Sequence, residues 1–144
     1  MVNKYTDLEI SVLSLLLQKP DLMKKTRLEN KYFIKHKKIW IFMNEFYKRF
    51  GNFDLTLMMA VSKNKYRMVE YIVWLIDQEA SPSLFKVYEQ QLIDEYNQTK
   101  KNKYVIEKVY ELANSLYVGN ITLTDFNKNL SDLYKNANEI FKKE

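Results

Sequence analysis

The chain has 144 residues, a length suited to one domain or to one domain with an appendage. Hydrophobic residues make up 47% of it, enough for a sizeable core, and only two glycines and two prolines interrupt it, which favours long helices. Cysteine is absent, which excludes disulfides, a thiol nucleophile and a cysteine metal site, and fits a reducing compartment.

The N-terminal stretch, MVNKYTDLEISVLSLLL, carries acidic residues where a signal peptide has its apolar segment. The longest apolar run, YIVWLI, is far shorter than the ~20 residues that span a bilayer as a helix. We therefore expect a cytoplasmic protein with no membrane partner.

The net charge of +5 is unevenly distributed. Residues 19–49 contain ten basic and three acidic residues, and the remainder of the chain is slightly acidic. Such a segment suits phosphate groups or an acidic partner surface, although a solvated face of a lysine-rich chain would look the same. The candidate patch for nucleic acid or an acidic partner comprises Lys24, Lys25, Arg27, Lys35, Lys37, Lys38 and Lys48.

Apolar residues recur at helical spacing through the first 80 residues. A helix is predicted from Asp7 to Gln18, followed by a short one after Pro20, where proline fits the first turn. A longer helix ends at Gly51, and its apolar face is formed by Ile39, Phe42, Met43, Phe46 and Phe50.

Two more helices complete this part of the chain. The first is short and follows Asp54 or Thr56 as its N-cap. The second runs from Met68 to Glu79, with Tyr71 and Trp74 off its inward face, which is predicted to consist of Val69, Ile72, Val73 and Ile76. Because strand-like alternation never extends beyond a few residues, we predict an all-α fold with a globular helical subdomain at residues 1–80.

Residues 81–144 are predicted to form a long antiparallel helical hairpin. Its turn lies near Gly119, a residue suited to the left-handed position after a helix end, and Thr122 with Asp125 has the spacing of a capping box. Apolar residues recur at alternating spacings of four and three on both sides of the turn, as in paired helices. The predicted hairpin seam, and candidate oligomer interface, comprises Val105, Val109, Leu112, Leu116, Phe126, Leu130, Leu133, Ala137 and Ile140.

The sequence offers little to catalysis. The two glycines are far apart and each is followed by Asn, so the chain has no glycine-rich loop of the kind that cradles nucleotide phosphates. His36 is the sole histidine and is expected at a helix N-terminus in a packing or hydrogen-bonding role. We predict a protein that is not an enzyme, with no catalytic residues, no metal site and no cofactor.

Several motifs occur in a recognisable order. EISVLSLLLQKPDLM leads from an apolar helix into a proline turn, and YFIKHKKIWIFM places aromatic and basic residues around His36. GNFDLTLMM begins with Gly51, and YIVWLIDQEASPSLFKVYEQQLIDEY contains Tyr71 and Pro82. Together with the hairpin, this series resembles the N-terminal collar domain of DnaB-type replicative DNA helicases over nearly the whole chain, although Lys37 stands where that family has Arg.

The resemblance implies a non-catalytic oligomerisation and protein-docking domain in DNA replication. In that family the domain forms the collar of a hexamer, a trimer of dimers joined through the hairpins, and contacts primase or a helicase loader within the primosome. The implied partners are therefore a second copy of the chain, primase or a loader, and single-stranded DNA inside the collar. The ATPase domain that follows in that family lies outside these 144 residues.

Two alternatives remain open at this point. The chain could be a stand-alone regulator, a loader or inhibitor that borrows the collar fold to bind a full-length helicase. It could also be a nucleic-acid-binding module that uses the basic segment 19–49.

Overall fold

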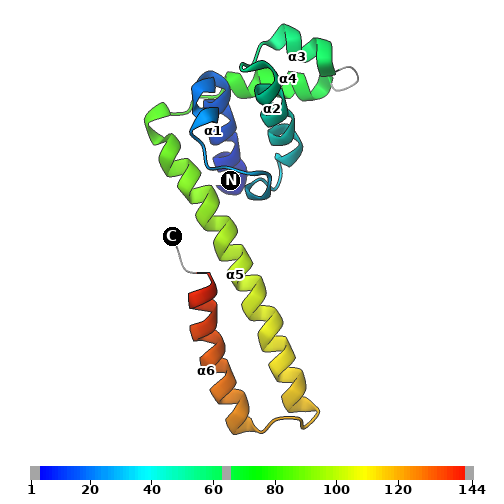
Figure 1. Cartoon of the computed structure of the whole chain (residues 1–144), viewed down its shortest axis with the longest axis vertical. Helices are drawn as coiled ribbons and strands as arrows, with labels where there is room; N and C mark the ends of the chain where they lie inside the picture. The colour runs from blue at the N-terminus through cyan, green and yellow to red at the C-terminus, as the bar shows by residue number, and fades with distance from the viewer. Residues whose placement is uncertain (1–3, 63–65, 142–144) are drawn as a thin grey trace. The chain divides into compact units, whose positions relative to one another are not determined.

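A computed structural model describes residues 4–62 and 66–141, and confirms the all-α prediction, since no strand occurs in this part of the chain. The elements are α1 (Lys4–Gln18), η1 (Pro20–Lys24), η2 (Asn30–Tyr32), α2 (Lys37–Phe50), α3 (Leu55–Ser62), α4 (Tyr66–Ile76), η3 (Pro82–Leu84), α5 (Phe85–Tyr117) and α6 (Leu123–Ile140), where η denotes a 3₁₀ helix (Figure 1). None of the described helices has the length and apolar character that a membrane span requires.

The chain divides into two compact units, Met1–Asp94 and Glu95–Glu144. The division lies later than the predicted boundary after residue 80, because the first turns of α5 contribute Phe85, Leu92 and Ile93 to the core of the N-terminal unit. It falls where α5 enters the polar stretch DEYNQTKKNK, which offers few apolar side chains for packing.

Local contacts account for several helix ends. Gly51 ends α2 in the left-handed conformation, with φ 73°, and its amide donates to the carbonyl of Tyr47. The Asp54 carboxylate accepts from the Leu57 amide at 2.9 Å and so caps α3. The first helix differs from its prediction, since α1 begins at Lys4 rather than Asp7.

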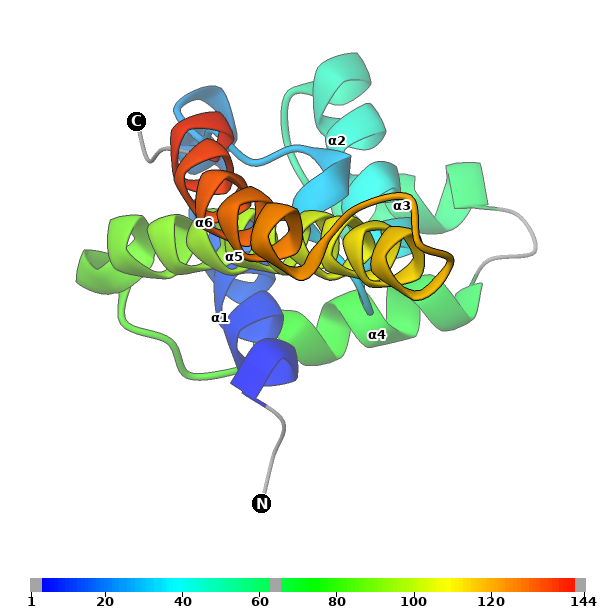
Figure 2. The same cartoon turned by 90° about the horizontal axis from the view of Figure 1, so that it is seen from below.

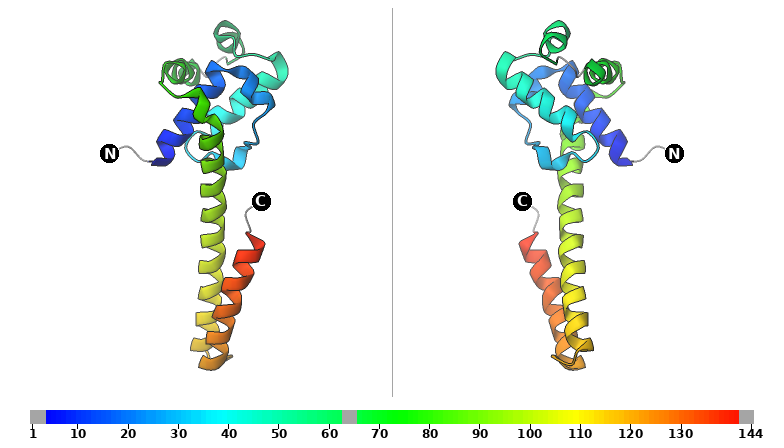
Figure 3. Two further views of the ribbon diagram at one scale, coloured as in Figure 1. Left: turned by 90° about the vertical axis from the view of Figure 1, so that its left-hand side faces the viewer. Right: turned by 90° about the vertical axis from the view of Figure 1, so that its right-hand side faces the viewer.

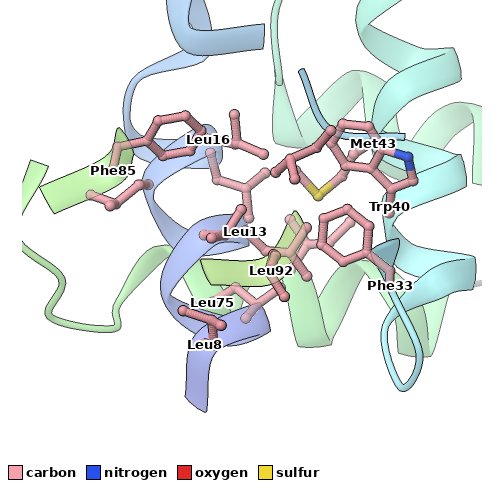
Figure 4. Packing of buried hydrophobic residues seen from close by; sticks show 14 of the residues in the cluster. Leu8, Leu13, Leu16, Phe33, Trp40, Met43, Leu75, Phe85 and Leu92 are labelled. Atoms are coloured by element: carbon pink, nitrogen blue, oxygen red, sulfur yellow. The ribbon is translucent and has the colours of Figure 1, made fainter. Parts of the chain in front are cut away.

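The core of the N-terminal unit is built around α1, which packs beside α4 (Figures 1 and 2). Val12, Leu13, Leu15 and Leu16 of α1 are fully buried. They meet side chains from α2, α4 and the first turns of α5, among them Trp40, Met43, Leu75, Phe85 and Leu92, as Figure 4 shows. Helix α1 supplies six buried apolar side chains to this core, more than any other described helix.

Two predicted helix faces are rotated from their expected positions. In α2 the buried residues are Trp40, Met43 and Phe46, whereas Ile39 and Phe42 are only partly covered. In α4 the buried residues are Val69, Ile72 and Leu75, and Val73 is exposed. Trp40 is drawn inward because its ring stacks on Phe33 and its indole N–H donates to Asn30 Oδ1 at 2.8 Å.

A buried carboxylate holds the segment that precedes α2. Glu9 of α1 is completely buried and accepts hydrogen bonds from the His36 amide at 3.0 Å and from the Ile34 amide at 3.3 Å. The same carboxylate lies 3.1 Å from His36 Nδ1, and His36 Nε2 lies 2.7 Å from the Tyr71 hydroxyl of α4. One acidic side chain thereby ties α1, the N-terminus of α2 and α4 together.

The ionisation of Glu9 follows from these contacts. Burial alone would raise its pKa, but the hydrogen bonds from His36 and Ile34, with the charge interaction with His36, outweigh burial and lower the pKa below the ordinary value of 4.5. Burial and the nearby Glu9 carboxylate raise the pKa of Tyr71 above its ordinary value of 10.0, so its hydroxyl stays protonated at neutral pH.

We expect Glu9→Gln to remove a pH-dependent part of the stability. A carboxylate with a lowered pKa contributes stability above its unfolded pKa and loses it as the pH falls through the folded value. The free-energy difference between wild type and Glu9→Gln, measured by urea unfolding, should therefore be largest at neutral pH and shrink below about pH 4.5. Glu79→Gln at an exposed carboxylate is the control, and an equal pH dependence in both variants would contradict this role for Glu9.

Candidate interaction surfaces

The hairpin unit is closed by a turn whose hydrogen bonds are all local. Gly119 adopts φ 83°, its amide donates to Leu116, and the Asn120 amide donates to Ser115 at 2.9 Å. This pattern satisfies the last carbonyls of α5 as a Schellman motif. The predicted left-handed conformation of Gly119 is therefore confirmed.

The predicted capping box of Thr122 and Asp125 is also confirmed, and it forms the N-terminus of α6. The Asp125 amide donates to Thr122 Oγ1 at 3.1 Å, and the Thr122 amide donates to Asp125 Oδ2 at 3.3 Å. From this point α6 runs back beside α5 in the antiparallel sense (Figure 3). Lys101 Nζ donates to Asn138 Oδ1 at 2.6 Å, which fixes the register at the far end of the pair.

The predicted seam residues lie mainly between the two helices. Leu133 and Ala137 are buried, Ile140 is 58% exposed, and the other six members of the seam are half-buried. The side chains that α5 and α6 direct at each other are thus largely used within the hairpin. A partner would have to meet other residues.

A second apolar stripe on α5 is left outside the seam. Ile106, Tyr110 and Tyr117 are 67%, 74% and 89% exposed. They follow one another at spacings of four and seven, so they share a face that lies about 100° round the helix from the seam. On α6 the exposed Leu123 and Tyr134 share a face eleven residues, or about three turns, apart.

These two stripes lie on the same side of the hairpin. On each helix, viewed from its own N-terminus, the stripe lies clockwise of the seam. Because α5 and α6 run in opposite directions, this same sense of rotation turns both stripes toward the same side of the hairpin. We call this surface the hairpin face and define it by Ile106, Tyr110, Tyr117, Leu123 and Tyr134.

The hairpin face differs in charge from the other side of the unit. Its intervening positions carry the uncharged residues Asn102, Ala113, Asn127 and Ser131, one exposed cation, Lys103, lies on the α5 stripe seven residues before Tyr110, and Lys128 and Lys135 lie at its edge. The opposite side carries the carboxylates of Glu111, Asp125 and Asp132. Aromatic residues enriched at the centre and charges at the rim are typical of a protein interface.

The residues of the predicted basic patch take different positions in the N-terminal unit. Lys24 and Lys25 are exposed around the end of η1, and Lys35 and Lys37 are exposed on either side of His36. Lys48 lines a hollow of ≈ 540 Å³ with Lys31 and Asn44, whereas Lys38 lines a second hollow of ≈ 550 Å³ with Phe42 and Met68. The structure thus brings three of the seven, Lys35, Lys37 and Lys38, to the start of α2 and spreads the rest.

Arg27 has a partner inside the fold. Glu89 of α5 is buried and accepts from Thr26 Oγ1 at 2.6 Å, from the Arg27 amide at 3.0 Å and from the Arg27 guanidinium at 3.3 Å. The guanidinium also donates to Gln90 Oε1 at 2.8 Å. Arg27 therefore holds the loop after η1 against α5, a role that its place in a basic run did not indicate.

No protein-family model matches the chain, and comparisons with curated proteins and with solved structures find no match. The resemblance to DnaB-type collar domains therefore stays a prediction from the sequence motifs.

Arg27→Ala should lower the free energy of unfolding by about 1 kcal/mol, because it removes a charged partner from the buried Glu89 while Arg27 itself is half in solvent. Lys25→Ala, two residues away and exposed, should change stability by less than about 0.5 kcal/mol. Urea unfolding of both variants checks this, and equal stabilities would show that the Arg27–Glu89 contact contributes nothing.

Gly119→Ala should destabilise the chain by about 1 kcal/mol, because an L side chain is strained at φ 83° even where the added Cβ has open space around it. Gly119→Asn should cost less, since asparagine tolerates the left-handed region. Thermal unfolding followed by circular dichroism measures both changes. A loss that is larger for Asn than for Ala would contradict this account of the turn.

Proposed function

We propose that this chain is a non-catalytic oligomerisation and protein-docking module, and that the hairpin face is the surface through which it associates with a second copy of itself. The single observation that carries the proposal is the hairpin face: five large apolar side chains remain exposed on one side of a two-helix unit whose seam is already filled.

A second copy is the occupant that the chemistry favours. Two hairpins meeting face to face would form a four-helix arrangement with the tyrosines at its centre, and a two-fold pair uses the same surface on both partners. The mainly apolar character of the hairpin face supports this, because like charges at the centre of a self-complementary contact would repel, and the one cation on the α5 stripe, Lys103, lies at its end.

The sequence motifs supply the wider setting. Their resemblance to the collar of DnaB-type replicative helicases supports dimerisation through hairpins, higher assembly as a trimer of dimers, and docking of primase or a helicase loader in DNA replication. Self-association is the step of this proposal that the hairpin face itself supports, and the replication partners rest on the resemblance.

Tyr110→Asp should weaken self-association by at least about 2 kcal/mol, or roughly 30-fold, because it places a charge among apolar side chains at the centre of the contact. Light scattering across a concentration series measures the change in mass, and circular dichroism should show unchanged helix content, since Tyr110 is exposed.

The matched control is Asn136→Asp, which adds the same charge at an exposed position of α6 on the other side of the seam. It should associate as wild type does. A wild-type chain that stays monomeric at every concentration would overturn the self-association proposal, and a mass lowered equally by both variants would show that the contact uses another surface.

A further inference from the structure

The exposed side of α4 carries an aromatic pair. Arg67, Tyr71 and Trp74 follow one another at spacings of four and three, so they share one side of this helix, on which Arg67 and Trp74 are exposed and Tyr71 is half-buried against the core. The ring centroids of Tyr71 and Trp74 lie 5.2 Å apart with an interplanar angle of 34°. Trp74 is 45% exposed, whereas Trp40, the other tryptophan of the chain, is 1% exposed.

The position of the aromatic pair is fixed by contacts between Tyr71 and His36. The Tyr71 hydroxyl lies 2.7 Å from His36 Nε2, the Tyr71 and His36 rings are stacked with centroids 5.5 Å apart, and His36 is in turn held by the buried Glu9. A tyrosine fixed at its hydroxyl presents its ring at a constant angle. The neighbouring indole therefore rests on a rigid support, which lowers the entropic cost of stacking a ligand on it.

Four cations lie on the two segments that contribute His36 and Tyr71. Lys35 and Lys37 flank His36 and are exposed, Lys38 lines the hollow that Met68 of α4 also lines, and Arg67 is exposed one turn before Tyr71. Two carboxylates, Glu70 and Asp77, are exposed on α4 near Trp74. Glu45 lines the same hollow as Lys38, so four cations face three acids and a positive balance of one remains.

We infer that this surface binds single-stranded nucleic acid: a base stacks on Trp74, and the phosphates on either side of it contact Lys35, Lys37, Lys38 and Arg67. An exposed indole beside cations is the combination that single-strand binders use, because every base has a flat face that an aromatic ring can cover. In a duplex those faces are already stacked, so single strands are preferred. The inference uses the N-terminal unit alone and does not depend on the hairpin face.

Tryptophan emission provides a direct test with the full chain. Titration with a 15-nucleotide oligothymidylate at ~50 mM salt should quench and shift the emission, and Trp74 is the source of the change because Trp40 is shielded from solvent. Trp74→Ala should weaken binding by about 5- to 150-fold, the loss expected for one stacked base, as measured by anisotropy of a labelled oligonucleotide. Trp74→Phe should keep most of the affinity, because it keeps an aromatic face.

The lysines have a separate signature in the salt dependence. Each lost phosphate contact should reduce the slope of log K against log salt by about 0.7 on a single strand, so Lys35→Gln with Lys37→Gln should reduce it by about 1.4. Lys86→Gln with Lys100→Gln, a pair of exposed lysines on α5 that belong to neither proposed surface, should leave the slope unchanged.

Three results would overturn the inference. One is the absence of oligonucleotide binding at ~50 mM salt. Another is wild-type affinity in a folded Trp74→Ala variant, which would mean that no base stacks there. The last is binding of polyglutamate as tight as that of the oligonucleotide with the same quenching of Trp74, which would identify an acidic protein as the ligand instead.

Discussion

The carboxylate of Glu9 is the constraint on which the N-terminal unit depends. A fully buried carboxylate must be compensated by donors, and here they come from Ile34 and His36, at the point where the chain enters α2. Without those donors the charge would be stranded in the core, so the approach to α2 has little freedom. The position of His36, the support under Tyr71 and the placement of the lysines beside His36 all follow from this one contact.

Glu89 plays the corresponding part at the other end of the same connection. It accepts from Thr26 and from the backbone and side chain of Arg27, just after η1. The connection between α1 and α2 has little regular structure of its own. Two glutamates, Glu9 of α1 and Glu89 of α5, accept hydrogen bonds from backbone amides of this connection and so hold it in place. Basic residues along it are therefore presented by a fixed scaffold rather than by a free loop.

Features with a local cause could be predicted from the sequence. The all-α fold, the hairpin turn at Gly119, the Thr122–Asp125 box and the end of α2 at Gly51 each depend on a few neighbouring residues. Features with a distant cause could not. Trp40 replaces Ile39 in the core because Phe33 and Asn30 receive it, and Glu9 and Glu89 sit at positions that look like ordinary solvated helix residues until their partners are known. On α5, apolar residues recur at helical spacing both in the stripe through Val109 and in the stripe through Tyr110. The sequence of α5 alone therefore does not indicate which stripe α6 covers.

The hydrogen bonds of the two units differ in how far they reach along the chain, and this bears on the order of folding. The turn of the hairpin is closed by contacts between residues three to five positions apart, so it can form as soon as its residues exist. The Arg27–Glu89 contact spans 62 residues. During synthesis the loop after η1 can therefore form its contacts with Glu89 only after the start of α5 has been made. The core of the N-terminal unit is complete only once the first turns of α5 are present.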